Sequence, residues 1–384
     1  MVIIDLHTHY PMHLLAREPM PPSRFRNRKT ALLDWVRGPV LRIANRLWNY
    51  PGAGSAPAVT NDSLARSSVR AAVSVLYAPF DEVDVGLPYG APPASRYMDG
   101  LLRQLDLVEA SVTGQTESVI ARNPAELDAA VQGGRVALVH AVEGGFHLGA
   151  SPREVAANVA SLARRGVAYI TLAHLFWRQV ATNTPALPFL PDRVYRWIFP
   201  QPDVGLTELG RAAVAAMVRN GVLVDVTHMS RRAFDETIAI LDALDPHERV
   251  PVIASHAACD FGGLAYNLAD DQVVAVARRG GVVGLIASRH YMARGLGPAR
   301  SFADSVNILC RHIDHVYALT GEHDTVAIGS DLDGFIKPTL PGLETPAGYD
   351  AVEAALTERY GAAVARRICQ DNAWRVLGSW SGSA

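Results

Sequence analysis

The stretches VLVDVTH at residues 222–228 and VPVIASH at residues 250–256 are short apolar runs that each end in a histidine. Runs that are apolar on nearly every residue are typical of strands buried on both faces of a parallel sheet. The same pattern recurs along the chain and predicts eight strands in total: Val2–His9, Val69–Ala78, Arg135–Glu143, Ala168–His174, Val222–His228, Val250–His256, Val282–Ser288 and Thr325–Asp331.

Amphipathic helical stretches separate these runs. Ser151-Pro152-Arg153-Glu154 has the residues of a helix start, with Ser as N-cap, Pro in the first turn and Glu at the third helical position. Thr207 and Ser230 are predicted N-caps of two later helices. A long helix over Phe302–Leu319 is expected to stop at Thr320-Gly321. Eight strands that alternate with helices predict an α/β fold, a closed (β/α)8 (TIM) barrel.

We expect one domain over residues 1–384, because no low-complexity linker interrupts the chain. Two connections, residues 10–60 and 175–205, are too long for simple loops, and each follows the carboxyl end of a strand. Both are therefore predicted to overhang the catalytic face. Within the first, residues 30–50 combine apolar and arginine residues. A packed helical cover over the barrel mouth is the simplest interpretation. A lid, a homodimer contact or a helix lying on a membrane surface are alternatives.

The bulk composition excludes several classes of protein. The formal net charge is −2, which does not favour nucleic acid as a partner. No run of about 18 apolar residues predicts a membrane span, and the N-terminal residues resemble a strand rather than a signal peptide. The three cysteines, Cys259, Cys310 and Cys369, form no C-x-x-C pair. We therefore expect no disulfide framework and a cytoplasmic location.

Residue types that bind metals recur at the carboxyl ends of the predicted strands. In a barrel these ends meet on one face, around one axis. Taken singly, each residue has an ordinary structural interpretation, such as a hydrogen-bonded histidine or a turn acid. Their recurrence on six separate segments favours one shared pocket. The residues concerned are His7, His9, Glu143, His174, His228, His256 and Asp331.

These residues lie in motifs that resemble the membrane dipeptidase family, within the amidohydrolase superfamily. The similarity runs in order along almost the whole chain. The matching segments include Asp5-Leu6-His7-Thr8-His9, Val142-Glu143-Gly144-Gly145, Val224-Asp225-Val226-Thr227-His228, Val252-Ile253-Ala254-Ser255-His256, Ala327-Ile328-Gly329-Ser330-Asp331-Leu332-Asp333-Gly334 and Asp371-Asn372-Ala373-Trp374-Arg375-Val376-Leu377.

The resemblance implies two zinc ions bridged by Glu143, with His7 and His9 completing one site and His228 and His256 the other. It also implies that His174 contacts the substrate carbonyl and that Asp331 handles the proton. A metal-activated water would then cleave a small amide, such as a dipeptide. The two lysines of the chain, Lys29 and Lys337, lie outside the predicted fourth strand. A modified lysine bridge, which many related enzymes use there, is therefore not expected.

The chain departs from the family pattern at two positions. The family usually has His-x-Asp where this chain has His7-Thr8-His9. It also has an arginine, which holds the substrate carboxylate, where Tyr266 precedes Asn267. Arg289, Arg294 or Arg178 could replace that arginine.

The predicted substrate-binding set is therefore His174, Tyr266, Asn267 and Arg289. Because Tyr266 is neutral, an enzyme of the same fold acting on a non-dipeptide amide or a lactone is an alternative. A non-catalytic barrel is a third alternative, which the nearly complete ligand set disfavours.

Overall fold

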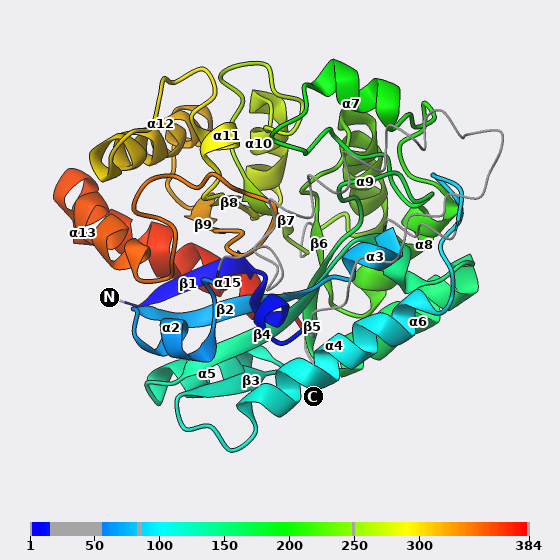
Figure 1. Cartoon of the computed structure of the whole chain (residues 1–384), viewed down its shortest axis with the longest axis horizontal. Coiled ribbons are helices and arrows are strands. Elements are labelled where there is room, and N and C mark those ends of the chain that lie inside the picture. Colours follow the sequence, from blue (N-terminus) through cyan, green and yellow to red (C-terminus); the bar gives the residue numbers. More distant parts are fainter. Residues whose placement is uncertain (1, 16–55, 83–86, 248–249, 382–384) are drawn as a thin grey trace.

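The computed structural model describes residues 2–15, 56–82, 87–247 and 250–381, and the strands of this part of the chain form one parallel sheet (Figure 1). Its strands are β1 (Ile3–Thr8), β2 (Val69–Leu76), β3 (Ser118–Ala121), β4 (Val136–Glu143), β5 (Val167–Thr171), β6 (Leu223–Asp225), β7 (Val252–Ala257), β8 (Val282–Leu285) and β9 (Val326–Ile328).

The sheet closes on itself. Its hydrogen-bonded order is β2-β1-β9-β8-β7-β6-β5-β4-β3, and β2 also pairs with β4. Eight strands thus form the ring, which confirms the predicted (β/α)8 barrel. The ninth, β3, was not predicted. It pairs with Val136–Val139 at the start of β4, whereas β5 pairs with β4 only from His140 onward. Its four residues are too few to show a strand pattern.

Several predicted strands extend about three residues beyond the observed ladder. The strand predicted to end at His228 ends at Asp225, and the one predicted to end at Asp331 ends at Ile328. The reason is conformational. His228 has φ +67° and Asp331 φ +56°, values in the left-handed region that a strand does not use. The backbone turns at His228 and Asp331, so these two side chains lie just beyond the last hydrogen-bonded residues of β6 and β9.

Helices surround the ring (Figure 1). They are α2 (Asn61–Ala65), α3 (Pro79–Glu82), α4 (Tyr97–Val112), α5 (Pro124–Gln132), α6 (Pro152–Arg164), α7 (Asp192–Ile198), α8 (Glu208–Arg219), α9 (Arg231–Leu244), α10 (Asp270–Arg278), α11 (Arg289–Met292), α12 (Phe302–Thr320), α13 (Gly348–Tyr360), α14 (Ala362–Arg366) and α15 (Asn372–Gly378), with short turns η1 (Tyr10–His13), η2 (Gly145–Leu148) and η3 (Arg367–Asp371).

The predicted helix ends are confirmed. The side chains of Ser151, Thr207 and Ser230 each accept a hydrogen bond from the backbone N–H three residues later. Gly321 has φ +77° and ends α12 in the left-handed conformation. Among the residues that the structure describes, no helix is both long and apolar enough to cross a membrane.

Apolar side chains fill the barrel below the carboxyl ends of its strands. Leu6, Val73, Val139, Tyr169 and Ile253 belong to this inner cluster, and a larger apolar layer packs between the strands and the helices. The carboxyl ends of the strands are left for polar groups. Of the two predicted overhangs, most of the first, residues 16–55, lies outside the described residues. The second, residues 175–205, includes α7.

Candidate metal centre

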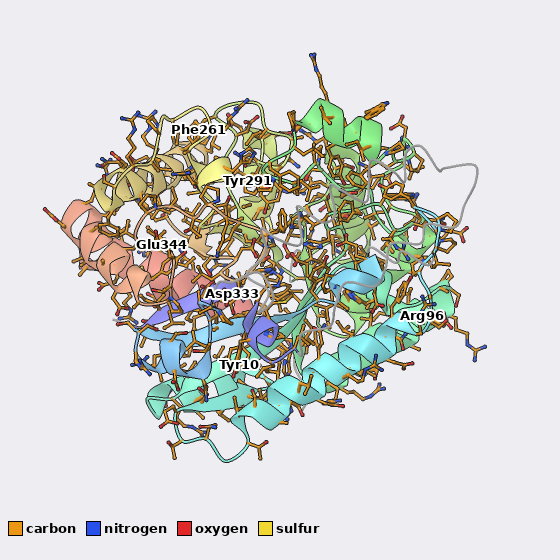
Figure 2. The ribbon with its side chains drawn as sticks, in the orientation of Figure 1. Tyr10, Arg96, Phe261, Tyr291, Asp333 and Glu344 are labelled. Carbon is orange, nitrogen blue, oxygen red and sulfur yellow. The ribbon has the colours of Figure 1, made fainter. Side chains whose placement is uncertain are left out.

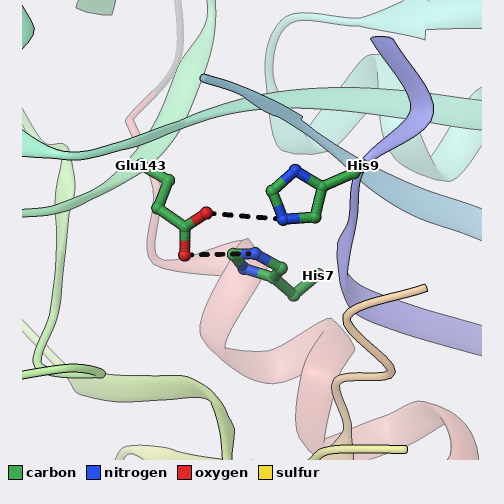
Figure 3. A group of neighbouring side chains, drawn as sticks. All are labelled: His7, His9 and Glu143. Atoms are coloured by element: carbon green, nitrogen blue, oxygen red, sulfur yellow. Dashed lines mark ion pairs between the residues drawn. The ribbon is translucent and has the colours of Figure 1, made fainter. Parts of the chain in front are cut away.

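Glu143, the last residue of β4, lies at the centre of the predicted cluster and is fully buried. The Nε2 atoms of five histidines surround its carboxylate. They belong to His7 at 3.5 Å, His9 at 3.4 Å, His174 at 3.3 Å, His228 at 3.5 Å and His256 at 3.5 Å. Figure 3 shows His7 and His9 facing its two oxygen atoms. The structure thus brings together side chains from β1, β4 and the segments at the ends of β5, β6 and β7.

Asp331 completes this group from the end of β9. Its Oδ1 atom lies 3.0 Å from His9 Nε2 and 3.8 Å from His7 Nε2. A Cβ atom added at Gly334 would lie only 1.9 Å from Asp331 Oδ1. The turn after β9 therefore needs glycine at position 334 for the carboxylate to occupy this place.

A hydrogen-bonded layer beneath the cluster orients two of the histidines. The Ser255 hydroxyl donates to the Asp225 carboxylate at 2.6 Å and lies 2.9 Å from His256 Nδ1 and 3.0 Å from His7 Nδ1. The Tyr169 hydroxyl donates to the Leu6 carbonyl and lies 2.8 Å from His7 Nδ1. Because both hydroxyl protons are used, the oxygens accept from the histidine Nδ1–H groups. The Nε2 lone pairs of His7 and His256 then face Glu143.

Several buried atoms of the cluster have no hydrogen-bond partner among the described residues. They include His7 Nε2, Asp331 Oδ1 and both carboxylate oxygens of Glu143. Buried polar atoms are normally paired, because an unpaired one carries its full desolvation cost. A cation would satisfy these acceptors together. Three sets of side chains have ligand atoms close enough to share an ion: His7–His9–Glu143, His7–His256–Asp331 and Glu143–His174–His228. Imidazole and carboxylate ligands suit zinc.

Opposite charges dominate the electrostatics of the cluster. Burial would raise the pKa of Glu143, but the neighbouring His174 holds it well below its ordinary value. Burial would lower the pKa of His174, but Glu143 and Glu82 raise it to about 9. The site thus pairs a buried anion with a buried imidazolium.

Glu82, the last residue of α3, was missed by the sequence analysis. It is buried, and its carboxylate lies 2.9 Å from His174 Nδ1 and accepts a hydrogen bond from the backbone N–H of Phe176 at 2.8 Å. Tyr77 also donates its hydroxyl to Glu82. The only sequence signal was an acidic residue four positions after Ala78, the predicted end of the second strand. Because the short helix α3 lies between them, Glu82 did not stand out as a strand-end residue.

A cavity opens beside the cluster. It is lined by His9, His174, Leu175, Ala186, His228, Tyr266, Tyr291, Asp331 and Phe335. The Tyr266 ring stacks on Tyr291 with 4.1 Å between ring centroids, and its hydroxyl donates to the His256 carbonyl at 2.7 Å. Tyr291 lies in α11, as Figure 2 shows. Leu175 and Ala186 belong to the second predicted overhang, which therefore contributes to the cavity wall.

The other predicted substrate-binding residues do not line this cavity. Asn267 donates its side-chain N–H groups to the carbonyls of Cys259 and Tyr291. Arg289 begins α11 with an exposed side chain. Arg178 is buried against the Tyr97 ring and donates to its hydroxyl, and Arg294 donates to the Gly262 carbonyl. Within the described part of the chain, the cavity wall carries no arginine or lysine.

A (β/α)8 barrel with a buried histidine–carboxylate cluster at the carboxyl ends of its strands has the architecture of a metal-dependent barrel enzyme. Comparison with known sequences narrows this class. The family profile "Membrane dipeptidase (Peptidase family M19)" matches residues 49–381. The chain therefore belongs to the membrane dipeptidase family.

Two curated relatives support this placement. The dipeptidase verJ of Clonostachys rogersoniana is 27% identical over 261 residues, which cover 67% of this chain and 59% of that protein. An uncharacterized dipeptidase of Schizosaccharomyces pombe is 31% identical over 232 residues, covering 60% of this chain and 49% of that protein. The chain thus matches only about half the length of these relatives.

Solved structures share the fold. A metallopeptidase from Rhodobacter sphaeroides, bound to a phosphinate mimic of the dipeptide L-Ala-D-Ala, aligns over 99% of both chains with a TM-score of 0.70 and 21% identity. The probable dipeptidase PvdM from Pseudomonas aeruginosa aligns over 89% of this chain and 98% of that chain, with a TM-score of 0.66 and 18% identity.

Proposed function

We propose that this protein is a binuclear zinc hydrolase that cleaves small dipeptide-like amides. The position of Glu143 carries the proposal, since five histidine nitrogens lie within 3.5 Å of its two oxygens. In this assignment Glu143 would be shared by two ions. His7 and His9 would complete the ligands of one, and His228 and His256 those of the other. Bound zinc ions would supply Lewis-acid activation of a water molecule and of the scissile carbonyl.

His174 and Asp331 have separate roles toward the substrate in this proposal. His174 presents Nε2 toward the centre of the cluster and would donate a hydrogen bond to the carbonyl oxygen as negative charge develops on it. Asp331 would accept the proton of the attacking water at its carboxylate and return it to the leaving amine. No covalent bond between the enzyme and the substrate is needed.

The cavity wall supports a particular kind of substrate. A dipeptide-like molecule is supported by the family and by the phosphinate dipeptide mimic bound to the related metallopeptidase. The neutral Tyr266–Tyr291 wall instead favours a molecule whose far end is uncharged or bulky. This feature supports the second candidate function, hydrolysis of a non-dipeptide amide or a lactone on the same residues.

The decisive experiment combines metal analysis with a substrate screen. Purified protein is expected to hold about two zinc ions per chain and to hydrolyse at least one of four substrate classes: L-L dipeptides, L-D dipeptides, N-acyl amino acids and lactones. Removing the metal with a chelator should abolish the activity, and added zinc should restore it. Hydrolysis that is unaffected by metal removal would refute the proposal, and metal binding without any hydrolysis would favour a non-catalytic barrel.

A further inference from the structure

We infer that Glu82 is a positioning residue for the reaction, which acts by fixing the His174 ring so that its Nε2 atom points at the substrate carbonyl. This inference rests on the proposed function, because it takes from it the role of His174. It adds a residue that neither the sequence motifs nor the metal ligands include.

The geometry around Glu82 is that of an anchored carboxylate. One oxygen, Oε2, lies 2.9 Å from His174 Nδ1 and accepts the hydroxyl of Tyr77. The other, Oε1, accepts the Phe176 backbone N–H at 2.8 Å. Tyr77 follows β2, whereas His174 and Phe176 follow β5. Glu82 therefore links the segments after these two strands by hydrogen bonds. A carboxylate that accepts several hydrogen bonds has little freedom to rotate.

This anchor determines which His174 nitrogen faces the cluster. A carboxylate accepts, so His174 Nδ1 donates to Glu82 and Nε2 is directed toward the cluster, 3.3 Å from Glu143 Oε2. Ring contacts restrict the same side chain, because Tyr77 and His228 each meet the His174 ring edge to face, with centroids 4.5 Å and 4.7 Å away. Without Glu82, those contacts would restrict the ring but would not specify which of its nitrogens faces the cluster.

Charge supports the same role. Burial alone would raise the pKa of Glu82, but the adjacent His174 lowers it, so the carboxylate is ionised in the folded protein. An ionised partner on Nδ1 stabilises the protonated ring, so that Nε2 also carries a hydrogen that it can donate to a developing oxyanion. This is the relationship by which a carboxylate orients a catalytic histidine and stabilises its charged form.

A double-mutant cycle tests whether Glu82 acts through His174. The variants are Glu82→Gln, His174→Ala and the combination, measured on the best wild-type substrate. We expect Glu82→Gln to lower kcat about 10-fold to 100-fold with little change in KM or zinc content, and Glu82→Asp to recover part of the loss. In the His174→Ala background, Glu82→Gln should change kcat by less than about twofold. Equal losses in both backgrounds, or an unchanged kcat in Glu82→Gln, would overturn the inference.

A spectroscopic measurement covers the cases in which activity is too low to compare. Nitrogen-15 NMR of histidine-labelled protein reports the protonation and hydrogen bonding of each His174 nitrogen. We expect a stable Nδ1–H signal in wild type and its loss or exchange broadening in Glu82→Gln, with a smaller change in Tyr77→Phe, which retains the carboxylate. An identical His174 signal in wild type and Glu82→Gln would also overturn the inference. If wild type shows no metal-dependent hydrolysis, the proposed function fails, but this signal still reports on Glu82.

Discussion

The Nε2 atom of His9 lies 3.0 Å from Asp331 Oδ1, so an imidazole at the end of β1 meets the carboxylate at the end of β9. The family pattern usually places an aspartate where this chain has His9. An aspartate there would set two carboxylates against each other, whereas an imidazole can pair with Asp331. The substitution also removes one negative charge from the ligand set.

We therefore predict that His9→Asp changes which metals the protein prefers. Carboxylate ligands favour harder ions such as Mn²⁺, and imidazole favours Zn²⁺. The affinity for Mn²⁺ relative to Zn²⁺ should rise in His9→Asp, as measured by competition with a metal-binding dye. His13→Asp is a suitable control, because His13 lies outside the cluster, with its Nδ1 atom 2.6 Å from the Tyr10 carbonyl. An unchanged metal ratio in His9→Asp would mean that His9 is not a ligand.

Glu143→Gln should lose most of the bound metal. The amide keeps the size of the side chain but offers only one oxygen and no charge, so it is a poor bridge between two ions. Elemental analysis of the purified variant is expected to find well under half of the wild-type zinc. A variant that retains two ions and full turnover would show that the ligand assignment is wrong.

Asp331→Asn should retain metal but lose turnover. General acid–base groups typically contribute about 10²–10⁴-fold to rate, and we expect a loss in kcat of at least that size. The nearby Asp333 provides the control. Its carboxylate accepts the backbone N–H groups of Ala58 and Val59 at 2.9 Å and 2.7 Å, which gives it a structural role. Asp333→Asn should therefore lower the melting temperature more than kcat, and wild-type rates in Asp331→Asn would remove Asp331 from the mechanism.

A polar cluster on the outer face of the barrel predicts a pH-dependent contribution to stability. Glu109 of α4 lies 3.6 Å from the ring of His140 on β4 and pairs with Arg122 and Arg165 at 3.1 Å and 3.2 Å. The His140 ring is the largest influence on the Glu109 carboxyl. Burial opposes it, and the two arginines add to it, so that the pKa falls from 4.5 to about 2.

A depressed carboxyl pKa stabilises the fold above the unfolded-state value and loses that contribution as the pH falls toward the folded-state value. Glu109→Gln should therefore be less stable than wild type at pH 7, on the order of 1 kcal/mol for such partly exposed pairs. The difference should shrink between about pH 4.5 and pH 2. Urea unfolding of both proteins across this range measures it, and a difference that stays constant with pH would contradict the assignment.

The sequence predicts the ring of strands well because the ring strands are mainly apolar and buried on both faces. Ser151, Thr207 and Ser230 likewise mark helix starts by local chemistry. It also predicts the candidate metal-binding side chains that the structure brings together, since strand ends in a barrel converge wherever the helices lie. Glu82 could not be found in this way. Its role depends on packing between α3 and the segment after β5, which lie about 90 residues apart. The turned backbone of His228 and Asp331 likewise arises from tertiary constraints that no local residue pattern encodes.

Substrate preference gives the last prediction, and it depends on Tyr266. The Tyr266 side chain lines the cavity beside His228, at a position where the family pattern has an arginine. A charge-assisted pair with a substrate carboxylate contributes roughly 1.5–3 kcal/mol, against about 1 kcal/mol for a neutral hydrogen bond. Tyr266→Arg should therefore raise kcat/KM for simple dipeptides relative to their C-terminal amides by about 10-fold. The ratio of the two substrates cancels general damage to the barrel, including the loss of the Tyr266 hydrogen bond to the His256 carbonyl. If wild type already prefers the free acids strongly, another cation binds the carboxylate, and Arg289 and Arg294 would be the first residues to substitute.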